Sequence, residues 1–175
     1  METKDSEVVS KRRRYLLISW AAVLFWAGII FWFSSQPARE SAHLSVGLTK
    51  VIASALGGLI PAGAMDLGVA DHLLRKTAHF LIYLVLGSLM LNGVRAKGIS
   101  GRKGFFIALG FCVLYALSDE FHQLFVPGRG AQLSDVLLDS LGALVGILLY
   151  ALLARRFLVS GIEETTPGEQ NNADS

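Results

Sequence analysis

The segment GFFIALGFCVLYALSDEFHQLFVPGRG, residues 104–130, joins an apolar run directly to a cluster of polar and charged groups. Its first fifteen residues carry no charge, whereas the remaining twelve contain an aspartate, a glutamate, a histidine, a glutamine and an arginine. A helix needs about 20 mostly apolar residues to cross a bilayer, so the segment is typical of a membrane span that ends in polar groups. Ionisable groups at membrane depth are costly, and a cluster of them indicates a functional site.

The composition of the whole chain also indicates a membrane protein. Of its 175 residues, 53% are hydrophobic and 17% are charged. A soluble domain is about one quarter charged. This length accommodates one domain. The single cysteine, Cys112, lies in an apolar run, and a lone cysteine excludes an internal disulfide. The sequence has no basic strip interleaved with aromatic residues, so we predict no nucleic-acid partner.

Four apolar segments predict an all-α membrane protein, a bundle of four transmembrane helices. The segments are Tyr15 to Phe33, His72 to Val94, Gly104 to Val126 and Leu133 to Leu153. The first has 19 residues and is not followed by a small-x-small cleavage site. A signal peptide has an apolar part of only about 7–15 residues, so we expect the first segment to be retained.

Basic residues are concentrated on one side of this four-span arrangement. Eleven lysines and arginines lie in the N-terminal segment, the connection between the second and third spans, and the tail, whereas five lie on the other side. The positive-inside rule then places both termini in the cytoplasm. The predicted divisions are a basic N-terminal segment, 1–14, a membrane domain, 15–153, and a tail, 154–175, whose polar composition is typical of disorder.

The connection between the first two spans is too long for a simple turn. Between Glu40 and Ile60, apolar residues recur at helical spacing at Leu44, Leu48, Val51, Ile52, Ala55 and Leu59. This stripe predicts an external helix that is either amphipathic, lying in the outer interface, or re-entrant. Its length is compatible with a lid over a site.

Polar residues that are scattered in the sequence are expected to meet at one end of the bundle. Helical phase groups them on three faces. These are Lys76, His79 and Tyr83; Tyr115, Asp119, His122 and Gln123; and Asp135, Asp139, Gly142 and Gly146. Because Gly142-x-x-x-Gly146 allows close helix packing, we expect that third face, with both aspartates, to point into the bundle. The glycines on either side of Arg129 permit a turn that folds this side chain back over the cluster.

The cluster contains groups suited to holding and transforming an anionic headgroup. Lysine and arginine bind phosphate, whereas histidine and carboxylate groups supply general acid and base catalysis. The candidate catalytic residues are Glu120, Asp119, His79, His122 and Asp135, with Glu120 or His122 activating a water or a hydroxyl. The candidate substrate-binding residues are Lys76, Arg129, Gln123, Tyr83, Asp139, Ser35 and Gln36.

Structural roles are the alternative for the same side chains. Carboxylates and histidine at these positions also suit ion pairs between helices, and we interpret Arg75 and His72 as surface residues. Several residues of the cluster are of types that can bind a metal ion, namely Asp119, Glu120, His122, His79 and Asp135. Their spacing matches none of the strong zinc patterns. We therefore predict no metal ligands and name no cofactor. The sequence also lacks a nucleophile elbow, a phosphate loop and a nucleophilic cysteine motif.

Three stretches resemble the VanZ-like family. They are FWFSSQP, residues 31–37, KTAHFLIYLVLG, residues 76–87, and SDEFHQLFVPGRGAQLSDVLLDSLGALVG, residues 118–146. The resemblance covers about residues 15–153, and the matching positions are Lys76, His79, Tyr83, Asp119, Glu120, Gln123, Arg129 and Asp135. Asp139 departs from the pattern, since the family often has asparagine there. The resemblance implies a small multi-pass protein of the bacterial cytoplasmic membrane, and the family's namesake is linked to low-level resistance to the glycopeptide teicoplanin.

Two functions follow as hypotheses. The first is an enzyme that acts at the outer leaflet on a phosphate-bearing lipid or lipid-linked wall precursor. The second is a non-catalytic protein that binds or shields such headgroups. Membrane lipids or lipid-linked envelope precursors are the expected partners in both cases, and the oligomeric state is left open. Transport of an anion or proton is a weaker alternative, because the inner halves of the spans look dry.

Overall fold

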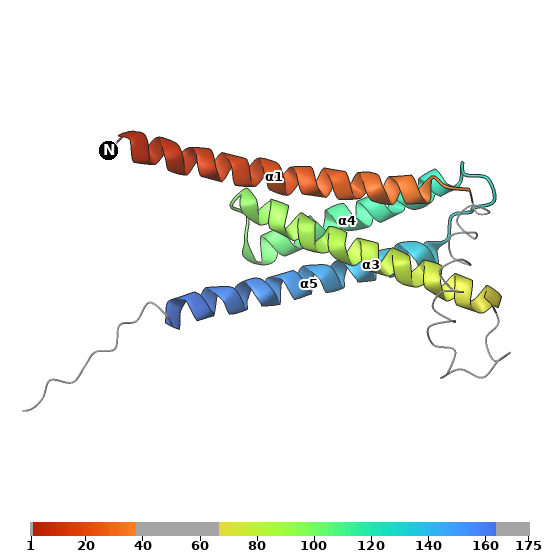
Figure 1. Ribbon diagram of the computed structural model, residues 1–175. Coiled ribbons are helices and arrows are strands. Elements are labelled where there is room, and N and C mark those ends of the chain that lie inside the picture. The colour runs from red at the N-terminus through yellow and green to blue at the C-terminus, as the bar shows by residue number, and fades with distance from the viewer. Residues whose placement is uncertain (1, 38–66, 164–175) are drawn as a thin grey trace, which may run out of the picture.

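The computed structural model describes residues 2–37 and 67–163, which form four helices and, within those ranges, no strand (Figure 1). The helices are α1 (Glu2–Ser34), α3 (Leu67–Ala96), α4 (Gly101–Gln123) and α5 (Leu133–Glu163). Each contains a segment long and apolar enough to cross a membrane. The prediction of an all-helical, four-span protein is therefore confirmed. The helix predicted between Glu40 and Ile60 lies outside the described residues.

Most helix boundaries differ from those expected, and three of the differences have an evident cause. Helix α1 begins well before Tyr15, so the basic N-terminal segment is also helical. An i,i+4 ion pair of 2.8 Å between Glu7 and Lys11 supports this part of the helix. Helix α5 continues past Leu153 to Glu163, since no proline interrupts it. Helix α4 ends before Val126, because the turn that follows requires Gly128 at φ +77°.

Helices α3 and α5 make the most extensive contact in the bundle, through glycines. A Cβ atom on Gly142 would collide with the backbone carbonyl of Phe80, and one on Gly146 with that of Leu84. On α3, Gly87 is equally close to the carbonyl of Ala143. The close packing predicted from Gly142-x-x-x-Gly146 is thus confirmed, and it turns that face of α5 towards α3.

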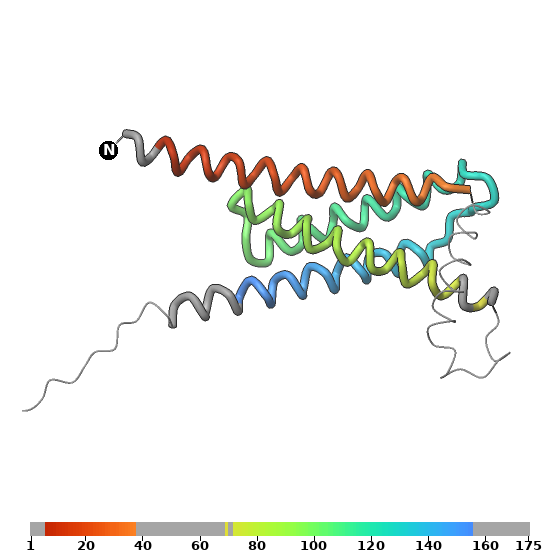
Figure 2. Tube along the Cα trace, viewed as in Figure 1, coloured from red at the N-terminus to blue at the C-terminus, as the bar shows by residue number. Residues whose placement is uncertain are grey.

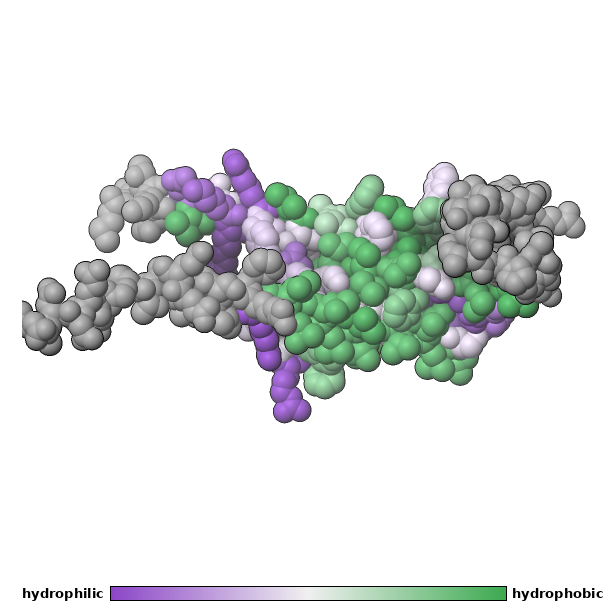
Figure 3. All heavy atoms as spheres, turned by 60° about the horizontal axis from the view of Figure 1, so that its bottom comes forward, coloured by the Kyte–Doolittle hydropathy of each residue, from purple (hydrophilic) through white to green (hydrophobic). Residues whose placement is uncertain are grey.

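The other helices pack on this pair through a small apolar core. On α4, Ala108, Cys112 and Ala116 recur every four residues and are fully buried, so the cysteine is a core residue as expected. Most large apolar side chains of all four helices point outwards. A space-filling view shows them as a broad apolar band, with hydrophilic groups towards the ends (Figure 3). This distribution suits a molecule whose middle is surrounded by lipid.

The chain path brings distant segments together at the two ends of the bundle (Figures 1 and 2). The turn between α3 and α4 lies at the same end as the first residues of α1. The end of α1, the first turns of α3 and the loop between α4 and α5 lie at the other end. The expected meeting of the polar segments at one end is therefore observed. We call this end the polar end.

Replacing Gly146 by alanine tests the α3–α5 contact. The new methyl group meets backbone rather than a flexible side chain, so we expect a loss of about 1–3 kcal/mol in the free energy of unfolding. Gly110→Ala on α4 is the matched control, since a Cβ there meets no atom within 4 Å. It should leave the thermal unfolding midpoint in detergent unchanged or slightly raised. Equal midpoints for both variants would show that the contact is not close.

Candidate functional site

An ion pair joins α3 to α5 at the polar end. The Lys76 ammonium donates a hydrogen bond of 2.6 Å to Oδ1 of Asp135, and both side chains are a little over one quarter exposed. The Ser134 hydroxyl donates to the same oxygen at 3.3 Å. The structure therefore brings together two residues that the sequence assigned to different roles, and the charge of Lys76 is partly neutralised by its partner.

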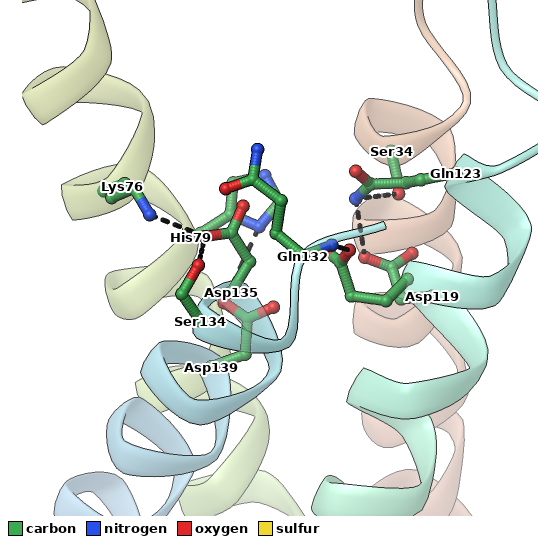
Figure 4. Close-up of polar contacts among 10 residues, drawn as sticks. Ser34, Lys76, His79, Asp119, Gln123, Gln132, Ser134, Asp135 and Asp139 are labelled. Carbon is green, nitrogen blue, oxygen red and sulfur yellow. Dashed lines mark hydrogen bonds and ion pairs between the residues drawn. The ribbon is translucent and has the colours of Figure 1, made fainter. Parts of the chain in front are cut away.

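Deeper in the bundle, three ionisable residues from three helices converge (Figure 4). His79 on α3 places Nδ1 3.6 Å from Oδ1 of Asp139 on α5. Asp119 on α4 completes the group, and one ligand atom from each residue lies within 4.8 Å of the others. Asp139 is fully buried and Asp119 is 3% exposed. We call these three residues the buried triad. The burial of Asp139 confirms the prediction that this face of α5 points into the bundle.

The triad is linked to α1 through a buried amide. The Gln123 side chain donates to Oγ of Ser34 at 3.0 Å and to Oδ2 of Asp119 at 3.4 Å. Sequence reasoning selected Ser35 and Gln36 instead of Ser34. The Ser35 hydroxyl donates to the Phe31 carbonyl of its own helix at 2.6 Å, and within the described residues the Gln36 side chain makes no hydrogen bond. Of these three residues only Ser34 is buried, at 1% exposed.

Two predicted catalytic residues are used in other contacts. His122 places Nε2 3.1 Å from the Ser35 hydroxyl and packs against the Phe31 ring at a centroid distance of 4.6 Å. It thus lies on the α1 side of α4. Glu120 is buried, and its Oε2 accepts a 2.8 Å hydrogen bond from the backbone N–H of Gln132. This contact anchors the loop between α4 and α5.

Arg129 folds back over the bundle, as the glycines around it predicted. Its guanidinium donates to the Phe33 carbonyl at 3.3 Å and interacts electrostatically with Asp119 and Glu120. Burial lowers the pKa of Arg129, and the positive charge of Arg75 lowers it further. An arginine still remains protonated at neutral pH, so two like charges face each other at the polar end.

A pocket opens at the polar end, and basic groups dominate its charged lining. It is lined in part by His72, Arg75, Lys76, His79, Arg129 and Asp135. Sequence reasoning assigned Arg75 and His72 to the surface, yet both contribute to this pocket. The sequence contained a signal for this pocket, namely basic residues at helical spacing on one face of α3. These residues are His72, Arg75 or Lys76, and His79.

The opposite end also contains polar groups that join helices, although the sequence suggested that the inner halves of the spans are dry. Oδ1 of Asn92 accepts hydrogen bonds of 2.6 Å from the hydroxyls of Tyr15 and Tyr150. Its amide donates to Ser19 at 3.1 Å. These partners come from α1 and α5, so the asparagine joins three helices. The network suits a structural role, because both ends of the amide are hydrogen-bonded.

The fold and the polar end define a class: a multi-pass helical membrane protein in which ionisable residues from distant segments meet at one end of the bundle. The sequence model of the VanZ/LLP1 family matches residues 19–154, most of the chain. The protein therefore belongs to the VanZ/LLP1 family, as the resemblance indicated. No curated protein and no solved structure matches the chain.

Replacing Glu120 by alanine should release the loop between α4 and α5. The Gln132 N–H loses a charged acceptor, and such hydrogen bonds contribute about 1.5–3 kcal/mol. We expect the amide of Gln132 to exchange its hydrogen at least about tenfold faster, measured by hydrogen–deuterium exchange in detergent. Glu7→Ala, on the exposed start of α1, is the control. Unchanged exchange at Gln132 in the Glu120 variant would contradict the anchoring role.

Proposed function

We propose that the protein is a membrane-embedded enzyme that acts on a phosphate-bearing lipid or lipid-linked envelope precursor at its polar end. The observation that carries the proposal is the pocket lined by three cationic side chains, with His79 at its wall. An anionic group is the ligand that such a lining attracts. Lipid headgroups lie at the depth where a helix bundle ends, so a phosphate on a lipid is the natural source.

The phosphate is held mainly by Arg129 and Arg75. Their planar guanidinium groups match the geometry of phosphate oxygens. A bound anion also relieves the repulsion between the two positive charges. Lys76, whose ammonium contacts Asp135 at 2.6 Å, lines the same pocket and adds a third positive charge. Asp135 in turn holds Lys76 at the pocket wall, which assigns it a positioning role.

His79 is the group best placed for acid–base catalysis in this proposal. It lines the pocket, and its Nδ1 faces the buried carboxylate of Asp139. A carboxylate on one side of an imidazole orients the ring and stabilises its protonated form, which is the general arrangement of a positioned base. Glu120 and His122 are engaged by Gln132 and Ser35, so we reassign the acid–base role from them to His79.

The setting proposed for this activity is the bacterial cytoplasmic membrane, with the polar end at the outer leaflet. Support comes from the basic residues on the opposite side of the spans, which favour the cytoplasm. Lipid-linked wall precursors are exposed at the outer leaflet, and altering them would change susceptibility to glycopeptides of the teicoplanin type.

A non-catalytic headgroup-binding or shielding protein is the second candidate. It is favoured by the number of polar groups already paired within the protein, such as Lys76 with Asp135 and Glu120 with Gln132. In this case the pocket binds an anion and changes access to the membrane surface, while no lipid is converted.

Mass-spectrometric profiling of total lipids and lipid-linked precursors separates the two candidates. Cells carrying the protein, His79→Gln, Arg129→Gln or an empty vector are compared at equal membrane levels of protein. An enzyme should shift at least one phosphate-bearing species. His79→Gln should reduce that shift by at least about 100-fold, the usual contribution of a general acid or base. Arg129→Gln should also reduce it, through weaker binding.

Two further variants provide controls for the profile. Arg102→Gln removes a cation near the opposite end of the bundle and should keep the shift. His122→Gln makes the same chemical change as His79→Gln but outside the pocket. A loss of the shift in His79→Gln alone would support His79 as the acid–base group, whereas a loss in His122→Gln would support the assignment made from the sequence. Identical profiles in all cells, together with an envelope phenotype that Arg129→Gln abolishes, would contradict the enzyme and support the non-catalytic shielding protein.

A further inference from the structure

We propose that the buried triad, His79, Asp119 and Asp139, is a binding site for one divalent transition-metal ion. Each residue comes from a different helix, and a ligand atom from each lies within 4.8 Å of the other two. The inference concerns the ion alone and does not depend on the proposed reaction.

The spacing within the triad suits ligands of a shared ion better than a hydrogen bond. Nδ1 of His79 and Oδ1 of Asp139 are 3.6 Å apart, beyond the usual range for a hydrogen bond. Two ligands at about 2.0–2.2 Å from a tetrahedral ion are separated by about 3.3–3.6 Å. That pair therefore already has the separation of two metal ligands, and a ligand atom of Asp119 lies within 4.8 Å of both.

Four polar atoms of the triad make no hydrogen bond. Both carboxylate oxygens of Asp139, Oδ1 of Asp119 and Nδ1 of His79 are buried and make no hydrogen bond. Asp139 is fully buried and points into the group, so bulk solvent does not reach it. Buried charges in proteins are paired, hydrogen-bonded or bound to metals. Here a metal ion is the partner that satisfies all four atoms at once.

The surrounding charges leave room for a cation. Lys76 is engaged by Asp135, and Arg129 interacts with both Asp119 and Glu120. The positive charge of Arg129 is therefore shared between Asp119 and Glu120 and is not reserved for the triad. A divalent ion held by two carboxylates and a neutral imidazole makes a neutral unit, which lowers the cost of placing these groups in the bundle.

Tyr83 provides a further polar group beside the triad. Its hydroxyl is buried without a hydrogen bond and interacts electrostatically with Asp119 and Asp139. Structural zinc sites are closed by four protein ligands, whereas sites with three protein ligands keep a position for water. A water on the ion is a suitable partner for the Tyr83 hydroxyl.

The ligand set selects the kind of ion. One imidazole and two carboxylates, without a thiolate, suit Zn²⁺ or Mn²⁺ better than Cu⁺ or Mg²⁺. Because His79 also lines the anion pocket, an ion here would lie next to a bound phosphate and act on it as a Lewis acid, and His79 would then serve as a ligand of the ion instead of as the acid or base. Sequence spacing did not reveal this set, since it joins residues from three helices and includes Asp139 in place of Glu120, His122 and Asp135.

Metal titration of the full chain tests the inference. The protein is purified in detergent, stripped with a chelator, and titrated with Mn²⁺ and with Zn²⁺ by calorimetry, and bound metal per chain is measured by elemental analysis. We expect one ion per chain. Asp139→Asn should weaken binding by at least about tenfold, because it removes a charged ligand. Asp119→Asn is the second ligand variant, in case the first does not fold.

Asp135→Asn is the matched control, since it makes the same change one helical turn away on α5. Its carboxylate contacts Lys76 and is not in the triad, so affinity should stay within about threefold of the parent. For Mn²⁺, electron paramagnetic resonance of the bound ion should change in Tyr83→Phe while the stoichiometry stays at one.

Three results would overturn the metal site: no stoichiometric ion in the folded parent protein, unchanged affinity in folded Asp139→Asn and Asp119→Asn, or equal losses in Asp139→Asn and Asp135→Asn. Any of these would leave a buried polar cluster without a metal. None bears on the lipid profiles, in which a phosphate-bearing species either shifts or does not. The metal site and the proposed function can therefore fail separately.

Discussion

The close backbone approach of α3 and α5 is the constraint on which the polar end depends. Gly142 and Gly146 lie directly against carbonyls of α3, so α5 has only one rotation about its axis that keeps this contact. That rotation buries Asp139, which lies one turn before Gly142 or Ala143, and brings it to His79. In a membrane, apolar surface alone does not select which helix faces meet, and close packing of small residues does.

The polar groups at this end are arranged in layers. Lys76 and Asp135 pair near the surface, the arginines surround the pocket, and the buried triad lies below. Helices that end at the same depth share the cost of desolvating these groups, because each provides partners for the others. The proposed anion and the proposed metal ion complete the same arrangement, one above and one within the bundle.

Several features of this site were predictable from residue types and spacing. The spans, the shared depth of the polar segments, the inward face of α5 and the turn around Arg129 follow from hydropathy, helical phase and glycine placement. The contacts of Ser34 and His122 were not predicted, because neighbouring residues on a helix point about 100° apart and the rotation of α1 and α4 depends on their neighbours. The contact of Glu120 with the Gln132 backbone was not predicted either, since such a hydrogen bond has no sequence signature.

The sequence by itself determined that the chain has four segments able to cross a membrane and that the polar residues of the candidate site lie at one end of them, because both follow from the one-dimensional pattern of apolar and polar residues. The tertiary structure alone decided which of these residues touch. His79, Asp119 and Asp139 are distant in the chain, and their meeting depends on the packing distance and rotation of three helices. These quantities arise from contacts between side chains and backbone, which no spacing within a single helix contains.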